Sequence, residues 1–231
     1  RRNWPDYATP ALYFHEHSTI LGARLVTYMN VIDQWHIAIE QLSETDSIIK
    51  QIIETYNGEK MKLRGVAFET LARSIVGQQI SVKAADSVWK RLEKLCQNKI
   101  EKGKILSLSH DKLRSAGLSN QKTMYLRNVA ESDILETKWD TISDEKAIEQ
   151  LCTIKGIGVW TAEMFLIFHL ARPNILPLAD IGLIRGIKIN YYGGDKINKN
   201  QLETFREKWS PWCTVATWYL WRSLDPIPVE Y

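Results

Sequence analysis

From Leu151 to Gly186 the chain reads LCTIKGIGVWTAEMFLIFHLARPNILPLADIGLIRG, and the architecture can be worked out from this stretch. A helix end is followed by the turn Gly156-Ile157-Gly158 and by a strongly apolar helix that begins near Val159. Two glycines around one apolar residue permit a tight turn whose backbone can approach a ligand closely. The free N–H groups and the positive dipole end of the second helix point at the same place. We therefore predict that this turn holds a phosphate oxygen through backbone amides.

Asp180 is the second informative feature of the stretch, because it follows the loop ARPNILPLA and stands at the start of the next helix. Pro173 and Pro177 stiffen the approach to it. Taken alone, the glycine turn is most simply a connection between helices, and Asp180 is most simply an N-cap. The N-cap does not exclude chemistry, because a helix dipole keeps a carboxylate ionised. Such a carboxylate can stabilise the positive charge that develops on a sugar as its base departs.

The rest of the chain is dominated by helical periodicity from about Val31 onward, and strand signals are absent after residue 60. We predict an all-α fold of about ten short helices in two lobes, with a cleft between them. Either Thr45 or Asp46 can cap the second helix, Ser81, Ser119 and Ser143 are further candidate N-caps, and a loop is predicted around Gly103. The predicted helices are 31–42, 47–56, 66–79, 82–95, 110–117, 121–135, 144–152, 159–170, 180–190, 200–209 and 211–224.

Composition narrows the class of protein. The formal net charge of +3 over 231 residues is too small to indicate nucleic acid by itself, and nine tryptophans offer both core material and surfaces for stacking bases. The three cysteines show no CxxC spacing, which indicates reduced thiols rather than disulfides or a zinc site. No apolar run is long enough to span a membrane, and the first thirty residues lack the order of a secretory signal. We expect a cytoplasmic location, with the nucleoid or a nucleus as the place of action.

The hairpin over 151–161 followed by Asp180 resembles the signature of the helix-hairpin-helix (HhH-GPD) DNA glycosylase superfamily. Several further stretches are similar to its 3-methyladenine DNA glycosylase II group, in consistent order from Asp33 to Leu224. They are ARSIVGQQISVKAADSVWKRL (72–92), SAGLSNQKTMYLRNVA (115–130), GIGVWTAEMFLIFHLARP (156–173) and WSPWCTVATWYLWRSL (209–224). The glycosylase domain is accordingly placed at residues 33–231, and residues 1–32 form an N-terminal arm without a clear match.

The resemblance implies a DNA glycosylase that removes alkylated bases from duplex DNA in base excision repair, with Asp180 as the catalytic carboxylate. Trp160 stands where bifunctional members carry a Schiff-base lysine, so lyase activity is not expected. Trp160 and Trp221 are expected to line the base pocket. Gln79, with Ile80 beside it, matches the tip that enters the minor groove, and Gly156, Gly158 and Trp160 are expected to contact DNA.

The resemblance also bears on cofactors and partners. The backbone carbonyls of Cys152, Ile154 and Ile157 match positions that hold a monovalent cation, Na⁺ or K⁺. An iron–sulfur cluster is not expected, because only Cys213 lies where four clustered cysteines would be needed. Lys155 and the pair Cys213-Thr214 depart from the family pattern and put local DNA contacts in doubt. The expected partner is double-stranded DNA that contains damaged bases, bound by a monomer.

Two other functions remain open at this point. A non-catalytic DNA-binding module would keep the hairpin but would have no use for Asp180, and a glycosylase for oxidised or deaminated bases would share most of the motifs. Glu163 and His169 are expected to be structural, Trp209 and Trp212 to lie in the core, and the ranking among alkylated bases depends on a pocket shape that the sequence does not reveal.

Overall fold

The computed structural model describes residues 30–56 and 58–224 of the chain. Within these ranges it contains twelve α-helices and two short 3-10 helices and no strand, which confirms the all-α prediction. The helices are α1 (Trp35–Thr45), α2 (Ser47–Thr55), α3 (Ala67–Gly77), α4 (Val82–Leu95), α5 (Lys102–Ser107), α6 (His110–Ser115), α7 (Asn120–Glu131), η1 (Ile134–Glu136), η2 (Trp139–Thr141), α8 (Asp144–Cys152), α9 (Val159–Phe168), α10 (Ile181–Tyr192), α11 (Lys199–Trp209) and α12 (Cys213–Arg222). Of the predicted N-terminal arm, residues 1–29 lie outside the described residues.

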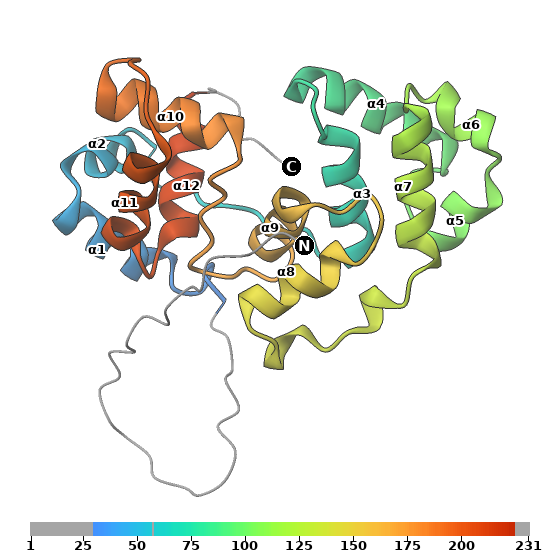
Figure 1. Cartoon of the computed structure of the whole chain (residues 1–231), viewed down its shortest axis with the longest axis horizontal. Helices are drawn as coiled ribbons and strands as arrows, with labels where there is room; N and C mark the ends of the chain where they lie inside the picture. Colours follow the sequence, from blue (N-terminus) through green and yellow to red (C-terminus); the bar gives the residue numbers. More distant parts are fainter. Residues whose placement is uncertain (1–29, 57, 225–231) are drawn as a thin grey trace, which may run out of the picture.

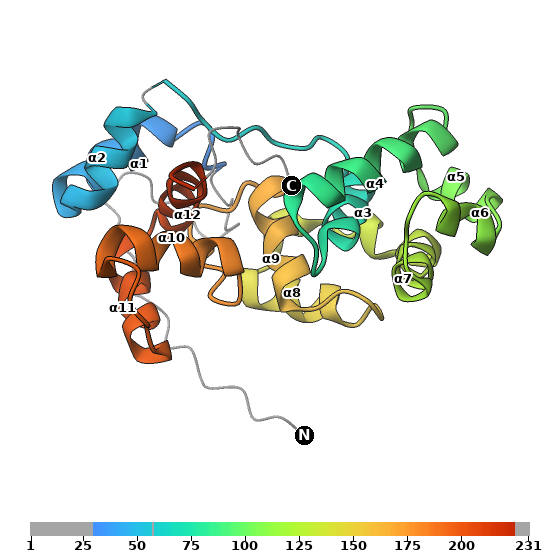
Figure 2. The ribbon, with the colours of Figure 1, turned by 90° about the horizontal axis from the view of Figure 1, so that it is seen from above.

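The helices gather into two groups (Figures 1 and 2). The terminal lobe consists of α1, α2, α10, α11 and α12, in which both ends of the described chain meet. The middle lobe consists of α3 to α9, with α3 packed against α4, α7 and α9. The chain passes between the lobes twice, through residues 58–66 and again through residues 169–180. The second passage delivers Asp180 to the place where the lobes meet.

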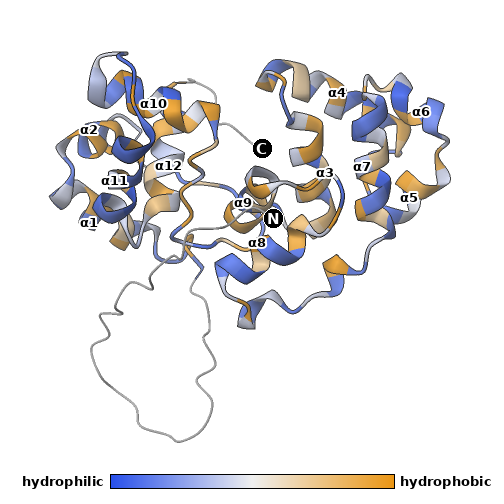
Figure 3. Cartoon of the chain, viewed as in Figure 1, coloured by the Kyte–Doolittle hydropathy of each residue, from blue (hydrophilic) through white to orange (hydrophobic). Residues whose placement is uncertain are grey.

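Local capping explains where most helices begin. The hydroxyls of Ser81, Ser119 and Ser143 accept hydrogen bonds from N–H groups in the first turns of α4, α7 and α8, as predicted. Asn198 forms a capping box with Gln201 at α11. The outer helices alternate hydrophilic and hydrophobic colour along their length in Figure 3, as amphipathic helices do.

Three sequence predictions of helix limits were wrong by more than two residues. The helix predicted over residues 121–135 ends at Glu131, because Ser132 has an extended backbone, and a separate 3-10 helix follows it. The predicted loop around Gly103 is the helix α5, which the buried side chain of Ile105 fixes against α7 despite the low helix propensity of glycine. The first helix begins at Trp35 rather than Val31, because residues 31–34 form a turn that the backbone bond from Val31 N–H to the Ala171 carbonyl (2.9 Å) holds in place.

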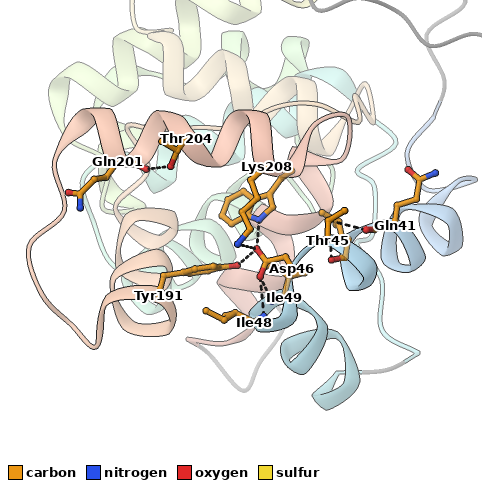
Figure 4. Close-up of polar contacts among 11 residues, drawn as sticks. Gln41, Thr45, Asp46, Ile48, Ile49, Tyr191, Gln201, Thr204 and Lys208 are labelled. Carbon is orange, nitrogen blue, oxygen red and sulfur yellow. Dashed lines mark hydrogen bonds and ion pairs between the residues drawn. The ribbon is translucent and has the colours of Figure 1, made fainter.

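Asp46 joins three helices of the terminal lobe (Figure 4). Its Oδ1 caps α2 by accepting from the backbone N–H groups of Ile48 and Ile49, as the sequence predicts. Its Oδ2 accepts from the Tyr191 hydroxyl at 2.6 Å and from the Trp209 indole at 2.9 Å, and it pairs with Lys208 at 2.9 Å. These contacts fix the ends of α10 and α11 against the start of α2.

The described residues also include two tryptophans and three cysteines about which the sequence makes predictions. Trp209 and Trp212 are buried and belong to the core, as predicted. Cys96, Cys152 and Cys213 are free thiols. Among the described helices none has both the length and the apolar character needed to cross a membrane.

Candidate active site

Asp180 is the N-cap of α10, and three N–H groups converge on its carboxylate. Its Oδ1 accepts from the Leu183 backbone N–H at 2.6 Å and from the Trp221 indole at 2.8 Å. Its Oδ2 accepts from the Trp160 indole at 2.8 Å. The residue is only 5% exposed. The N-cap role is therefore confirmed, and two tryptophans from other helices add indole N–H donors to the same carboxyl group.

The surroundings of Asp180 are rigid. Its backbone N–H donates to the Pro177 carbonyl at 2.8 Å, within the loop that the two prolines stiffen. Trp221 is buried and stacks on Phe168 with ring centroids 5.9 Å apart. A Cβ on Gly182 would lie 3.0 Å from Asp180 Oδ1 and 3.1 Å from the Trp221 ring. Glycine at this position leaves the carboxylate and its indole donor in contact.

The hairpin between α8 and α9 requires glycine at its first glycine position, because of the backbone conformation there and a close neighbouring side chain. Gly156 has φ +110°, a conformation that L side chains rarely adopt, and a Cβ there would lie 2.2 Å from the Tyr125 ring. Gly158 is different, because its φ is −98° and an added Cβ would meet nothing within 4 Å. Folding alone does not demand glycine at 158, so open space beside the N-terminus of α9 is left for an incoming group.

Two polar side chains support this hairpin, and sequence reasoning missed both. Gln78 Nε2 donates to the Gly156 carbonyl and to the Thr161 hydroxyl, both at 3.0 Å. Asn128 Nδ2 donates to the Lys155 carbonyl at 2.9 Å. These side chains come from α7 and the end of α3, and no periodicity in the sequence pairs them with residues 155–161. The adjacency of Gln78 to the predicted tip at Gln79 was the one available signal.

The predicted minor-groove tip is a turn between α3 and α4. Gln79 is exposed and has a positive φ of 57°, which is uncommon for a residue other than glycine. Ile80 is also exposed, at 41%. A pocket of about 350 Å³ lies between this turn, the start of α7 and the hairpin, and Gln79, Lys122, Tyr125 and Gly158 are among its lining residues.

Comparison with known families agrees with this geometry. The model described as "HhH-GPD superfamily base excision DNA repair protein" matches residues 72–211, which include the tip, the hairpin and Asp180. The chain belongs to the HhH-GPD superfamily. This range is more than half of the chain, and it spans both lobes from α3 to the end of α11.

Individual proteins of known sequence or structure are also similar to this chain. DNA-3-methyladenine glycosylase 1 of Schizosaccharomyces pombe is 29% identical over 81% of this chain and 85% of the relative. A solved 3-methyladenine DNA glycosylase of S. pombe, in complex with abasic DNA, has a TM-score of 0.74 at 28% identity and covers 84% of this chain and 98% of that one. A DNA-3-methyladenine glycosidase of Bacillus halodurans has a TM-score of 0.66 at 35% identity, over 84% and 92% of the two chains.

Two titratable residues that the sequence analysis expects to be structural have shifted pKa values. Burial raises the pKa of the Glu163 carboxyl to about 8; Arg206 opposes this shift and Asp180 adds to it. Among the described residues Glu163 Oε2 is buried without a hydrogen-bond partner. Burial lowers the pKa of His169, whose Nδ1 lies 3.2 Å from the Arg64 carbonyl, so it is a satisfied helix-end residue, as predicted.

A larger cavity of about 860 Å³ lies elsewhere, between residues 58–64, the outer parts of α3 and α4, and α12. Arg222 and Glu59 form an ion pair of 2.9 Å beside it, and Phe168 and Trp218 also line it. Neither Asp180 nor Trp160 is among its lining residues. Size therefore does not identify the candidate active site, which is recognised by the geometry around the carboxylate.

Proposed function

We propose that this HhH-GPD protein is a monofunctional DNA glycosylase that hydrolyses the N-glycosidic bond of alkylated bases of the 3-methyladenine type in duplex DNA. The observation that carries the proposal is the carboxylate of Asp180, buried and held by three N–H donors at the start of α10, close to the hairpin. The names of its relatives, several of them DNA-3-methyladenine glycosylases, support the reaction class.

The proposed reaction needs only one carboxylate. The target nucleotide leaves the base stack, so that its C1′ can approach Asp180. Alkylation at N3 or N7 of a purine gives the base a positive charge, and the bonding electron pair leaves with it. The ionised Asp180 stabilises the positive charge that develops on the sugar. Water then supplies a hydroxyl to C1′, and its remaining proton passes to solvent.

The hairpin and the α3–α4 turn are proposed to hold the DNA during this step. The N-terminus of α9 has no side-chain cap and a Cβ on Gly158 would meet only open space, so the first N–H groups of the helix suit a phosphate oxygen, a contact that carries no lesion information. Gln79, with Ile80 beside it, would fill the gap that the departed base leaves, because both are exposed at the tip of a turn. The proposed partner is thus damaged double-stranded DNA, bound by a monomer.

A monovalent cation is proposed to reinforce the phosphate contact. The Ile154 carbonyl accepts from the Ile157 N–H at 3.0 Å, whereas no described hydrogen bond ends on the carbonyls of Cys152 or Ile157. Carbonyl oxygens are hard ligands of the kind that Na⁺ and K⁺ take, so the three residues fit such an ion. When bound, the cation would add positive charge beside the phosphate. No cluster or catalytic metal enters the proposed mechanism.

Lyase chemistry is proposed to be absent, because Trp160 has no amine that could form a Schiff base. The experiment that tests the function incubates the protein with duplexes that carry 3-methyladenine, 7-methylguanine, 1,N6-ethenoadenine, hypoxanthine or 8-oxoguanine. We expect strand breaks at an alkylated base only after alkali, and no covalent complex after borohydride. Preferential release of 8-oxoguanine would favour the oxidised-base alternative, and no release from any duplex would favour a binding module.

A further inference from the structure

Ile181 stands out among the apolar side chains of the described residues, because 82% of it is exposed. It is the first residue of α10 and follows Asp180 directly. Ile181 does not pack in the protein interior. Helix α10 packs there through other residues, including Leu183 and Ile187, which are fully buried. Single exposed apolar side chains are common on protein surfaces, so its meaning depends on its position.

That position is beside the proposed reaction centre. The Cα atoms of Ile181 and Asp180 are about 3.8 Å apart, as consecutive residues must be. Gly182 carries no side chain. The indole N–H groups of Trp160 and Trp221 donate hydrogen bonds to the Asp180 carboxylate from the protein interior. Ile181 is therefore the neighbouring side chain of α10 that reaches into solvent next to Asp180. Asp180, which precedes this first turn, is joined to Trp160 in the first turn of α9 by a 2.8 Å hydrogen bond.

We propose that Ile181 is a substrate-contacting residue that packs against the deoxyribose of the flipped nucleotide. The inference rests on the proposed function, in which C1′ must approach Asp180. The carbon atoms of the sugar ring offer an apolar surface next to C1′, and they arrive beside an aliphatic group that is uncovered in the free protein. Their contact excludes water from both surfaces.

The contact also has a consequence for the chemistry. With water excluded on the solvent side of Asp180, the local dielectric falls, and the carboxylate stabilises positive charge on the sugar more strongly. The effect of Ile181 should therefore appear in the rate of bond cleavage by bound enzyme. It should not appear in the affinity for undamaged duplex, in which no nucleotide occupies the site.

A pair of substitutions of the same shape tests this directly. Ile181→Val and Ile181→Thr give side chains of nearly equal size that differ by one hydroxyl in place of a methyl group. Because residue 181 is exposed in the free protein, neither change should move the melting temperature. We expect single-turnover excision within about threefold of the wild type for valine, and at least a tenfold loss for threonine, because the hydroxyl would be buried against the sugar.

The same helix supplies the control. Ile189 is 49% exposed on α10 and lies about 12 Å further along the helix axis, so Ile189→Thr should leave excision unchanged. Equal rates for the valine and threonine variants of residue 181, or an equal loss for Ile189→Thr, would overturn the inference while the wild type remained active. A wild-type protein that released no base would overturn the proposed function and the inference with it.

Discussion

The indole N–H of Trp160 donates a 2.8 Å hydrogen bond to Oδ2 of Asp180, although the two residues belong to different helices and are twenty positions apart. The bond joins the first turn of α9, which follows the hairpin, to the N-cap of α10. It places the element proposed to grip the DNA backbone next to the carboxylate proposed to act on the sugar. Both ends of this bond come from the stretch over residues 151–186.

Removing only the donor of this bond should slow excision. Trp160→Phe keeps an aromatic wall but takes one of three donors from Asp180, and hydrogen bonds to charged groups are worth about 1.5–3 kcal/mol. We expect a loss of about 10- to 100-fold in single-turnover excision. Trp212→Phe is the matched control, because its indole bonds to Gln41 at 2.6 Å in the terminal lobe. Unchanged excision by Trp160→Phe would show that this donor does not support the carboxylate.

The two hairpin glycines should respond differently to substitution. Gly156→Ala brings a Cβ to 2.2 Å from the Tyr125 ring at positive φ, so the melting temperature should fall by several degrees. Gly158→Asp should fold normally, because aspartate is a good N-cap and the space beside it is open. Its negative charge should weaken binding to damaged and undamaged duplex alike, by about tenfold in fluorescence anisotropy titrations. Loss of excision by Gly158→Asp with unchanged affinity for undamaged DNA would contradict the backbone contact.

Glu163 should make the protein less stable as pH rises. Its pKa is about 8 in the folded protein against an ordinary value of 4.5, so folding favours the protonated form. The resulting penalty is absent below pH 4.5, grows as pH rises, and levels off above pH 8. Glu163→Gln removes the penalty, and urea denaturation should find the variant more stable by about 4 kcal/mol at pH 7.5 but not at pH 4.5. Excision should be retained. Glu149→Gln, on an exposed part of α8, is the control; an identical pH profile for both variants would refute the assignment.

Asp46 should have the opposite pH dependence. Burial raises its pKa, but hydrogen bonds from Tyr191, Trp209 and Lys208 outweigh burial and hold the pKa below its ordinary value of 3.8. Its contribution to stability is therefore present above pH 3.8 and is lost as pH falls below it. Tyr191→Phe should cost about 1–3 kcal/mol at pH 7, and less in acid. Tyr192→Phe, at the neighbouring position, should cost little in the same urea titrations, and an equal cost for both would count against the network.

The all-α fold, the helix starts and the hairpin could be predicted because they depend on local chemistry. Serine hydroxyls at Ser81, Ser119 and Ser143 cap the helices that follow them, and Gly156 adopts the positive φ that the turn needs. The helix α5 was missed for the converse reason. Its sequence is locally poor, and a tertiary contact through the buried Ile105 decides its conformation.

The contacts across the site could not be predicted from sequence spacing. Trp221 reaches Asp180 over forty-one positions, and Gln78 reaches Gly156 over seventy-eight. Each pair lies within one lobe and depends on how helices that are distant in the sequence pack against each other, which no periodicity encodes. The positions of Trp160, Trp221 and Gln79 were predicted through resemblance to a family, and their roles toward DNA remain predictions.

The most direct test of the account is single-turnover excision by Asp180→Asn on a duplex with one alkylated purine, alongside affinity for the same duplex. Asparagine is a good N-cap and retains an oxygen for the Leu183 and Trp221 donors, so folding should survive. We predict affinity close to the wild type, a melting temperature lowered by the loss of the Trp160 bond in a protein that still folds, and excision reduced by at least about 10²- to 10³-fold. Near-normal excision by the folded variant would contradict the central claim that the carboxylate of Asp180 drives base removal.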